Sequence, residues 1–243
     1  MTLLVVGAGD VGRWFAEVVG GPVAFADADP AVAEAAAATV APDARAVPLD
    51  ADETFDVVCV AVPLPLAAEA VERHAPKAGE AVVDVTGAMG PPLDAMARAA
   101  PDRERASFHP LFAPDAAPGN VAVTVDADGP TVEALRGAVA DAGNDLVSVT
   151  AVEHDDAMET VQGRTHAAVI AFALAADDDV PDGLETPVYE TLRSLAERVT
   201  GGTPRVYADI QSTFDGADSV AAAARRIADA DREEFETLYE DAR

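Results

Sequence analysis

The chain reads TLLVVGAGDVG at residues 2–12, a short apolar run that leads straight into a glycine-rich turn. A helical pattern follows from Arg13 to Val19, so the stretch has the form strand, turn, helix. In such a unit Gly7 permits the tight turn, Gly9 lets a pyrophosphate approach the backbone, and Gly12 lets the helix pack closely on the strand. The helix N-terminus adds free N–H groups and the positive end of a dipole. The stretch therefore predicts a dinucleotide-binding turn whose cofactor-binding residues are Gly7, Gly9, Asp10, Val11 and Gly12.

A carboxylate stands at the end of the next apolar run. Val23 to Ala26 is a predicted strand, and Asp27 follows it, twenty residues after Gly7. A carboxylate in this position binds the ribose hydroxyls of NAD, and no arginine follows to receive the 2′-phosphate of NADP. We therefore expect Asp27 to bind the cofactor and the cofactor to be NAD. The competing interpretation is that Asp27 only helps to cap the next helix, a role for which Asp29 is better placed.

Apolar runs and helical patterns alternate regularly up to about Thr150. The run from Asp56 to Val62 is almost continuously apolar, as expected for a strand buried on both faces of a parallel sheet. Ligands of such sheets bind outside the carboxyl ends of the strands, so the loop from Thr86 to Pro92 should face the nicotinamide. The predicted fold class is α/β, a Rossmann-type doubly wound parallel sheet. Its expected strands are Thr2–Val6, Val23–Ala26, Arg45–Pro48, Asp56–Val62, Ala81–Val85, Val121–Val125 and Leu146–Val149.

Beyond Thr150 the pattern is helical, which predicts an all-helical C-terminal domain. Ala151 to Ala176 is expected to be one long helix, on which Gln162 and His166 share a face. An acidic loop ending at Gly183 should close it, and a helix beginning at Pro187 carries Arg198. We expect residues 1–150 to form the NAD-binding domain. By analogy with other chains in which a helical region follows a nucleotide-binding domain, residues 151–243 should bind substrate and form a homodimer.

The segment from Ser107 to Asp115, SFHPLFAPD, carries the candidate catalytic group, His109. Two prolines in five residues argue against a regular strand, while Phe108, Leu111 and Phe112 favour burial. The segment is therefore expected to be a rigid apolar loop that presents an acid/base imidazole. The competing interpretation is a buried turn with a structural histidine.

The composition is strongly acidic, with 44 Asp and Glu against 16 Lys and Arg and a formal net charge of −28. The negative electrostatic field of such a surface repels nucleic acid and anionic membranes, so neither is an expected partner. Lys77 is the only lysine. An acidic surface almost without lysine suggests a halophile's cytosol, where salt screens self-repulsion, although a moderately acidic mesophilic protein has a similar composition.

Cys59 is the only cysteine, which excludes an internal disulfide and a cysteine-based zinc site, and no metal site is expected. No signal-peptide pattern is visible, and the longest apolar runs are too short to span a bilayer. We therefore expect a cytoplasmic protein.

Several motifs, taken together, resemble the prephenate dehydrogenases in order and spacing over nearly the whole chain. They are GAGDVG at residues 7–12, FHPLFAPD at 108–115, EHD at 153–155 with Met158 and Gln162, His166, PVY at 187–189 and YADI at 207–210. The resemblance implies NAD-dependent oxidative decarboxylation of prephenate to 4-hydroxyphenylpyruvate, in tyrosine biosynthesis. It also implies a monofunctional enzyme without the mutase or regulatory domains that some members carry.

The resemblance assigns roles to individual residues. His109 matches the catalytic histidine that bonds the ring hydroxyl, and His166 matches a second active-site histidine. Arg198 matches the arginine that binds a substrate carboxylate, for which a bidentate guanidinium is well suited. Gln162 is expected beside the substrate on the helix of His166.

The sequence departs from the family pattern in two places. Many members carry a serine and a lysine where this chain has Gly87 and Met89, and Thr86 is the nearest hydroxyl that could replace the serine. Glu190 stands where some relatives carry an arginine. The alternative functions are an arogenate or broader cyclohexadienyl dehydrogenase, which a binding assay with both substrates would distinguish, and a non-catalytic nucleotide-binding regulator, which measurable turnover would exclude.

Overall fold

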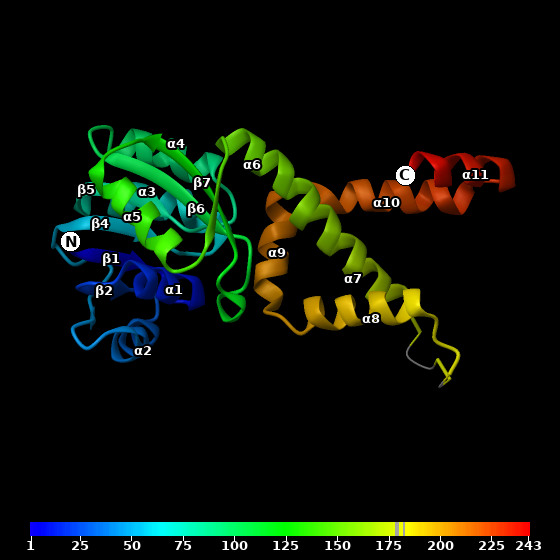
Figure 1. Cartoon of the computed structure of the whole chain (residues 1–243), viewed down its shortest axis with the longest axis horizontal. Helices are drawn as coiled ribbons and strands as arrows, with labels where there is room; N and C mark the ends of the chain where they lie inside the picture. Colours follow the sequence, from blue (N-terminus) through cyan, green and yellow to red (C-terminus); the bar gives the residue numbers. More distant parts are fainter. Residues whose placement is uncertain (178–179, 182) are drawn as a thin grey trace. The chain divides into compact units, whose positions relative to one another are not determined.

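The computed structural model describes residues 1–177, 180–181 and 183–243, and the acidic loop expected before Gly183 lies partly outside them. The chain forms two compact units, Met1–Asp155 and Asp156–Arg243. Figure 1 shows strands alternating with helices in the first unit and helices alone in the second.

The first unit is built on one eight-stranded sheet with the order β3-β2-β1-β4-β5-β6-β7-β8. Neighbouring strands are parallel except β6 and β7. The predicted doubly wound parallel sheet departs from parallel pairing between these two strands, because the loop 111–119 is too short for the crossover that parallel strands need. The strands are β1 (Leu3–Val6), β2 (Val23–Ala26), β3 (Arg45–Ala46), β4 (Phe55–Val60), β5 (Ala78–Asp84), β6 (Glu104–Pro110), β7 (Asn120–Ala127) and β8 (Asp145–Ser148).

Helices cover both faces of this sheet, which confirms the doubly wound α/β fold. Alternate strand residues point to opposite faces, so Leu3 and Val5 belong to one apolar core and Leu4 and Val6 to the other. Helices α1, α2 and α5 contribute to the first core, and α3 and α4 to the second. Their bounds are α1 (Asp10–Val19), α2 (Pro30–Val40), α3 (Ala67–His74), α4 (Gly90–Ala99) and α5 (Pro130–Asp141), with short 3₁₀ turns at Leu64–Leu66, Ala75–Lys77 and Pro114–Ala116.

The expectation that His109 lies in a loop was wrong: His109 and Pro110 are the last two residues of strand β6. Strand β5 ends opposite Ser107, so the residues that follow pair only with β7. The Leu111 N–H donates to the Asn120 carbonyl, and by the alternation of antiparallel pairing the nitrogen of Pro110 faces away from β7. A proline at a strand end with no partner on that side loses no hydrogen bond.

The burial expected for the apolar residues of this segment holds in part. Phe108 is fully buried, but Leu111 is 40% exposed. The rings of Phe112 and Trp14 pack in a T-shaped arrangement, with 5.5 Å between their centroids. The contact between Phe112 and Trp14 packs the segment after β6 against helix α1, which begins at the glycine turn.

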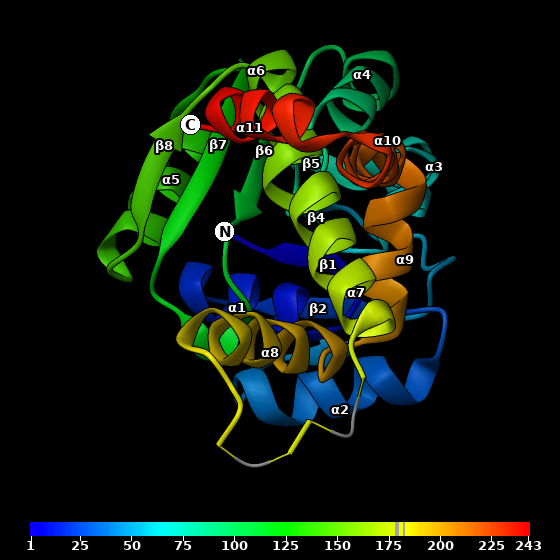
Figure 2. The same cartoon turned by 90° about the vertical axis from the view of Figure 1, so that its right-hand side faces the viewer.

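The second unit is helical. The helices are α6 (Ala151–Met158, which begins in the first unit), α7 (Thr165–Ala175), α8 (Pro187–Thr200), α9 (Pro204–Thr213), α10 (Gly216–Asp229) and α11 (Arg232–Asp241). Helix α8 packs against α7, as Figure 2 shows, and α10 also contacts α7. In the described part of the chain, no helix has both the length and the apolar character needed to cross a bilayer.

The helix expected from Ala151 to Ala176 is continuous as far as Ala175, but its middle, Glu159–Arg164, is π-helical instead of α-helical. A side chain from α9 forms a hydrogen bond with the backbone of this segment: the Gln211 amide donates to the Gly163 carbonyl at 2.9 Å. Gly163 and Gly216 also pack backbone to backbone, since a Cβ atom on Gly216 would lie 2.2 Å from the Gly163 carbonyl carbon. These contacts between distant segments decide the local winding, which periodicity cannot reveal.

Candidate functional site

The glycine turn after β1 has the geometry that its sequence predicts. Gly7 has a φ of +98°, and a Cβ atom there would lie 2.4 Å from the Ala61 carbonyl oxygen after β4. A Cβ atom on Gly12 would lie 2.2 Å from the Gly7 carbonyl oxygen. Around Gly9, by contrast, a Cβ atom would meet nothing within 4 Å. The structure therefore needs glycine for packing at two positions and leaves the third open to a ligand.

Two features favour an anion at this turn. Gly9 is the N-cap of α1 and offers no capping side chain, so backbone N–H groups at the start of the helix remain for a phosphate. The turn lies between β1 and β4, the point where the strand order reverses and where open α/β sheets bind ligands. Within this turn, Asp10 is exposed and forms an ion pair with Arg13.

Asp27 lies beside the turn and is bonded to it. Its Oδ2 accepts the Ala8 N–H at 2.8 Å, and its Oδ1 accepts the Asp29 N–H at 3.0 Å. Asp29 in turn caps α2 by accepting the Ala31 N–H, which confirms its expected role. The carboxylate of Asp27 thus stands where the glycine turn meets the end of β2, a place consistent with a ribose contact.

The loop after β5 is organised by a buried carboxyl group. Asp84 is fully buried, and its Oδ1 accepts both the N–H and the hydroxyl of Thr86, at 2.9 and 2.7 Å. Burial raises the pKa of Asp84 to about 7, against the opposing effect of the Thr86 bonds. The Ser107 hydroxyl on β6 also favours the charged form of Asp84, although its position relative to that carboxyl group is not that of a hydrogen bond. Because the Thr86 hydroxyl donates inside the loop, it has only lone pairs left for a ligand.

Asp84 should make the first unit's stability depend on pH. The pKa is 3.8 for a free carboxyl and about 7 in the fold, so between these values the folded state binds more protons. The contribution is therefore fully present below pH 3.8 and is lost as pH rises through about 7. The variant Asp84→Asn is neutral throughout, so its free energy of unfolding relative to wild type should rise between about pH 4 and pH 7 and level off above that. Urea unfolding in constant salt measures this, with Asp94→Asn on the exposed face of α4 as control; a pH-independent difference would contradict the assignment.

His109 is 6% exposed and bonds a second histidine, with 2.9 Å between its Nδ1 and the Nε2 of His154. His154 comes from α6 and is 2% exposed. Its Nδ1 lies 2.8 Å from the Oδ1 of Asp155. The Asp155 carboxylate also accepts the backbone N–H groups of Met89 and Gly90, each at 2.9 Å, at the start of α4. A continuous line of hydrogen bonds thus joins the end of β6 to the start of α4.

The protonation states along this line follow from burial and charge. Burial, and then the neighbouring His154, lowers the pKa of His109 to about 3, so its imidazole is neutral at neutral pH. Burial alone would raise the pKa of Asp155, but the hydrogen bonds from His154, Met89 and Gly90 outweigh it and lower the pKa. A neutral imidazole is the form that accepts a proton. In the sequence, His154 and Asp155 are visible only as part of the EHD motif at residues 153–155, and nothing there predicts a role for either of them.

The other expected site residues lie in the helical unit. The His166 ring packs edge-on against Tyr207, with 5.0 Å between centroids, and burial lowers its pKa. Its Nδ1 is buried and has no hydrogen-bond partner among the described residues. Gln162 lies in the π-helical segment. Arg198 is exposed in the last turn of α8 and has no ion-pair partner in the described part of the chain. In this unit, His166 and Tyr207 are brought together by α7 and α9.

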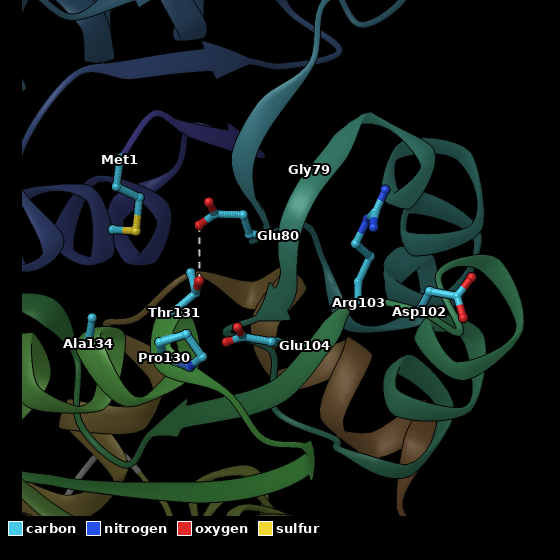
Figure 3. Close-up of a pocket in the computed structure, with 9 residues that line it drawn as sticks. All are labelled: Met1, Gly79, Glu80, Asp102, Arg103, Glu104, Pro130, Thr131 and Ala134. Carbon is cyan, nitrogen blue, oxygen red and sulfur yellow. Dashed lines mark hydrogen bonds between the residues drawn. The ribbon is translucent and has the colours of Figure 1, made fainter.

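A surface depression lies at the amino ends of strands β5 and β6, the ends opposite to those that carry the glycine turn and His109 (Figure 3). Glu80 and Glu104 line it, and Thr131 donates its hydroxyl to Glu80. The glycine turn and His109 stand at the carboxyl ends of their strands, so this depression is not part of the same site. Glu104 accepts the Val132 N–H at the start of α5.

Comparison with known proteins points to one family. Residues 16–125 match the family described as prephenate dehydrogenase, nucleotide-binding domain. Over 99% of its length the chain is 33% identical to a 4-amino-4-deoxyprephenate dehydrogenase of Streptomyces pristinaespiralis, and the match covers 89% of that protein.

Solved structures share the fold. A prephenate dehydrogenase from A. aeolicus, in complex with hydroxyphenyl propionate and NAD⁺, superposes with a TM-score of 0.73 at 16% identity, over 100% of this chain and 96% of that one. The Synechocystis arogenate dehydrogenase gives a TM-score of 0.63 at 16% identity, over 99% and 97% of the two chains.

Proposed function

The chain belongs to the prephenate dehydrogenase family, and from this membership we propose that it is an NAD-dependent dehydrogenase that converts prephenate to 4-hydroxyphenylpyruvate by oxidative decarboxylation. The observation that carries the proposal is a buried, neutral His109 at the carboxyl end of β6, in the sheet that holds the glycine turn. In this proposal the unit Met1–Asp155 binds the cofactor. The unit Asp156–Arg243 binds substrate and forms a homodimer.

The glycine turn fits the dinucleotide. The open space over Gly9 and the uncapped start of α1 suit its pyrophosphate, and Asp27 suits its ribose hydroxyls. No arginine neighbours Asp27 in the sequence to receive a 2′-phosphate, which favours NAD over NADP. The A. aeolicus relative, in complex with NAD⁺, supports the same choice. When bound, NAD supplies the hydride acceptor.

His109 acts as the general base. Oxidation of the substrate's carbinol carbon requires loss of its hydroxyl proton, and the neutral imidazole accepts that proton. Departure of carbon dioxide then aromatises the ring, which drives the reaction forward. His166, Gln162 and Thr86 complete the proposed substrate contacts, with Thr86 restricted to accepting a hydrogen bond.

The 33% identical relative favours a second candidate substrate, 4-amino-4-deoxyprephenate, which carries an amino group in place of the ring hydroxyl. Arogenate is a third, since the Synechocystis structure belongs to an arogenate dehydrogenase. Gly87 and Met89 stand where many members carry a serine and a lysine, so this chain offers neither a side-chain hydroxyl nor an ammonium group at those two positions.

A direct assay tests the function. The purified protein in molar salt is mixed with NAD and each of the three substrates, and NADH absorbance is followed. The highest kcat/KM with prephenate supports the proposal, whereas preference for the amino analogue or for arogenate would replace it. If no NADH forms with any of the three substrates although the protein still binds NAD, a nucleotide-binding regulator would be favoured.

Arg198→Ala should mainly raise the KM for the substrate, by roughly tenfold to a hundredfold, because a charged hydrogen bond to a carboxylate contributes about 1.5–3 kcal/mol. The control is Arg193→Ala on the same helix, whose guanidinium pairs with Glu197 instead. Steady-state kinetics at saturating NAD distinguish the two variants. An unchanged KM in Arg198→Ala would remove the arginine from the substrate site.

A further inference from the structure

His109, His154 and Asp155 form a line of hydrogen-bonded side chains, of which only His109 has a role in the proposed reaction. The two hydrogen bonds in the line measure 2.9 and 2.8 Å. Both histidines are more than nine-tenths buried, so neither bond competes with bulk water. Such a line has a direction, because each neutral imidazole has one nitrogen that donates and one that accepts.

The direction follows from Asp155. Its carboxylate accepts two backbone N–H groups besides His154, and its charged form is thereby stabilised. An ionised carboxylate can only accept, so the Nδ1 of His154 carries a hydrogen. At a pH where the imidazole of His154 holds a single proton, the Nε2 of His154 has the lone pair and accepts from His109. The Nδ1 of His109 therefore carries a hydrogen, and the lone pair of His109 is on Nε2.

We propose that His154 and Asp155 are positioning residues that hold His109 in the tautomer with its hydrogen on Nδ1, and that they take up the positive charge formed when His109 accepts a proton. This inference rests on the proposed role of His109 as general base. It goes further by naming the nitrogen that reacts, Nε2, and the place to which the charge moves.

The proton balance is complete within the line. The substrate hydroxyl proton bonds to Nε2 of His109, while the Nδ1 proton of His109 passes to Nε2 of His154. His109 is then neutral again, and the cationic His154 forms an ion pair with Asp155. The proton on Nε2 later leaves to water and the Nδ1 proton returns. The arrangement extends by one imidazole the use of a buried carboxylate to orient a histidine.

The tautomer can be measured in the protein without substrate. The chain has only four histidines, so ¹⁵N NMR of the imidazoles is tractable, and the His109→Asn variant identifies the His109 signals by their loss. A spectrum at about pH 8 keeps the neighbouring carboxyl Asp84 largely ionised. We expect a protonated Nδ1 and an unprotonated Nε2 for His109. A hydrogen on Nε2 would overturn the proposal.

Asp155→Asn tests the charge. It retains an oxygen that can accept from His154 but removes the negative charge, so kcat should fall about 100-fold or more, with Kd for NAD unchanged. Asp156→Asn makes the same change at the next, exposed position and should leave kcat within about twofold of wild type. A merely structural Asp155 would lower the melting temperature and leave kcat of the folded protein unchanged.

The two variants distinguish the role of His109 from the role of His154 and Asp155. If His109→Asn loses turnover while Asp155→Asn keeps it, the base assignment stands and the role of the line is wrong. If both variants keep turnover, the proposed function of His109 is itself wrong. If Asp155→Asn does not fold, the tautomer measured in the unaltered protein still decides.

Discussion

The variant His109→Asn should lose turnover by about 10²- to 10⁴-fold, the usual contribution of a general base. Asparagine keeps a side-chain hydrogen bond within reach of His154 but has no basic nitrogen. The buried site should therefore keep its shape and lose its proton acceptor. The measurement is kcat with the preferred substrate at saturating NAD, beside the Kd for NAD and the melting temperature. Both of these last quantities should stay close to wild type.

The pH profile of the wild-type protein tests the same role of His109. A base must be deprotonated to act, so activity falls as pH drops below its pKa in the free enzyme. Because burial lowers the pKa of His109 well below 6.5, kcat/KM in wild type should persist at a pH where an exposed histidine would already be protonated. Turnover within a few-fold of wild type in His109→Asn would remove His109 from the chemistry.

The variant Gly12→Ala should destabilise the first unit by about 3 kcal/mol or more, at or above the upper end for overpacked positions. The added methyl group would lie 2.2 Å from the Gly7 carbonyl oxygen and 3.0 Å from Cγ1 of Val5. A backbone oxygen in a tight turn cannot move aside as a flexible side chain can. Helix α1 would have to shift away from β1, and binding of NAD would be lost with it. Chemical unfolding and calorimetric titration with NAD measure the two effects.

Gly9→Ala is the matched control, because the same methyl group there meets nothing within 4 Å. Its stability should stay within about 1 kcal/mol of wild type, the usual range for Gly-to-Ala changes where the backbone allows them. The affinity for NAD should nevertheless fall about tenfold or more, since the methyl group would occupy space over the turn. Equal stability losses in the two variants would contradict the packing argument. Unchanged NAD affinity in Gly9→Ala would remove the pyrophosphate from this place.

The sequence predicts the first unit well where structure depends on neighbouring residues. The glycine spacing and the apolar run before it specify a strand, a turn and a helix, since the steric demands at Gly7 and Gly12 arise within a few residues. The buried strand β4 is visible as a continuous apolar run. The cap at Asp29 is likewise a contact between a side chain and a backbone group two residues away.

Only the tertiary structure decided how the candidate site is put together. His109 lies on a strand because β7 pairs with it, although its own prolines argue for a loop. His154 meets His109 across 45 positions of sequence, and Asp155 reaches the start of α4 across 65 and 66. The π-helical turn at Gly163 likewise depends on Gln211, a distant residue. Local steric contacts and apolar periodicity are determined by residues that are close in the sequence. The burial and the hydrogen-bond partners that set a histidine's tautomer arise only when distant segments pack together.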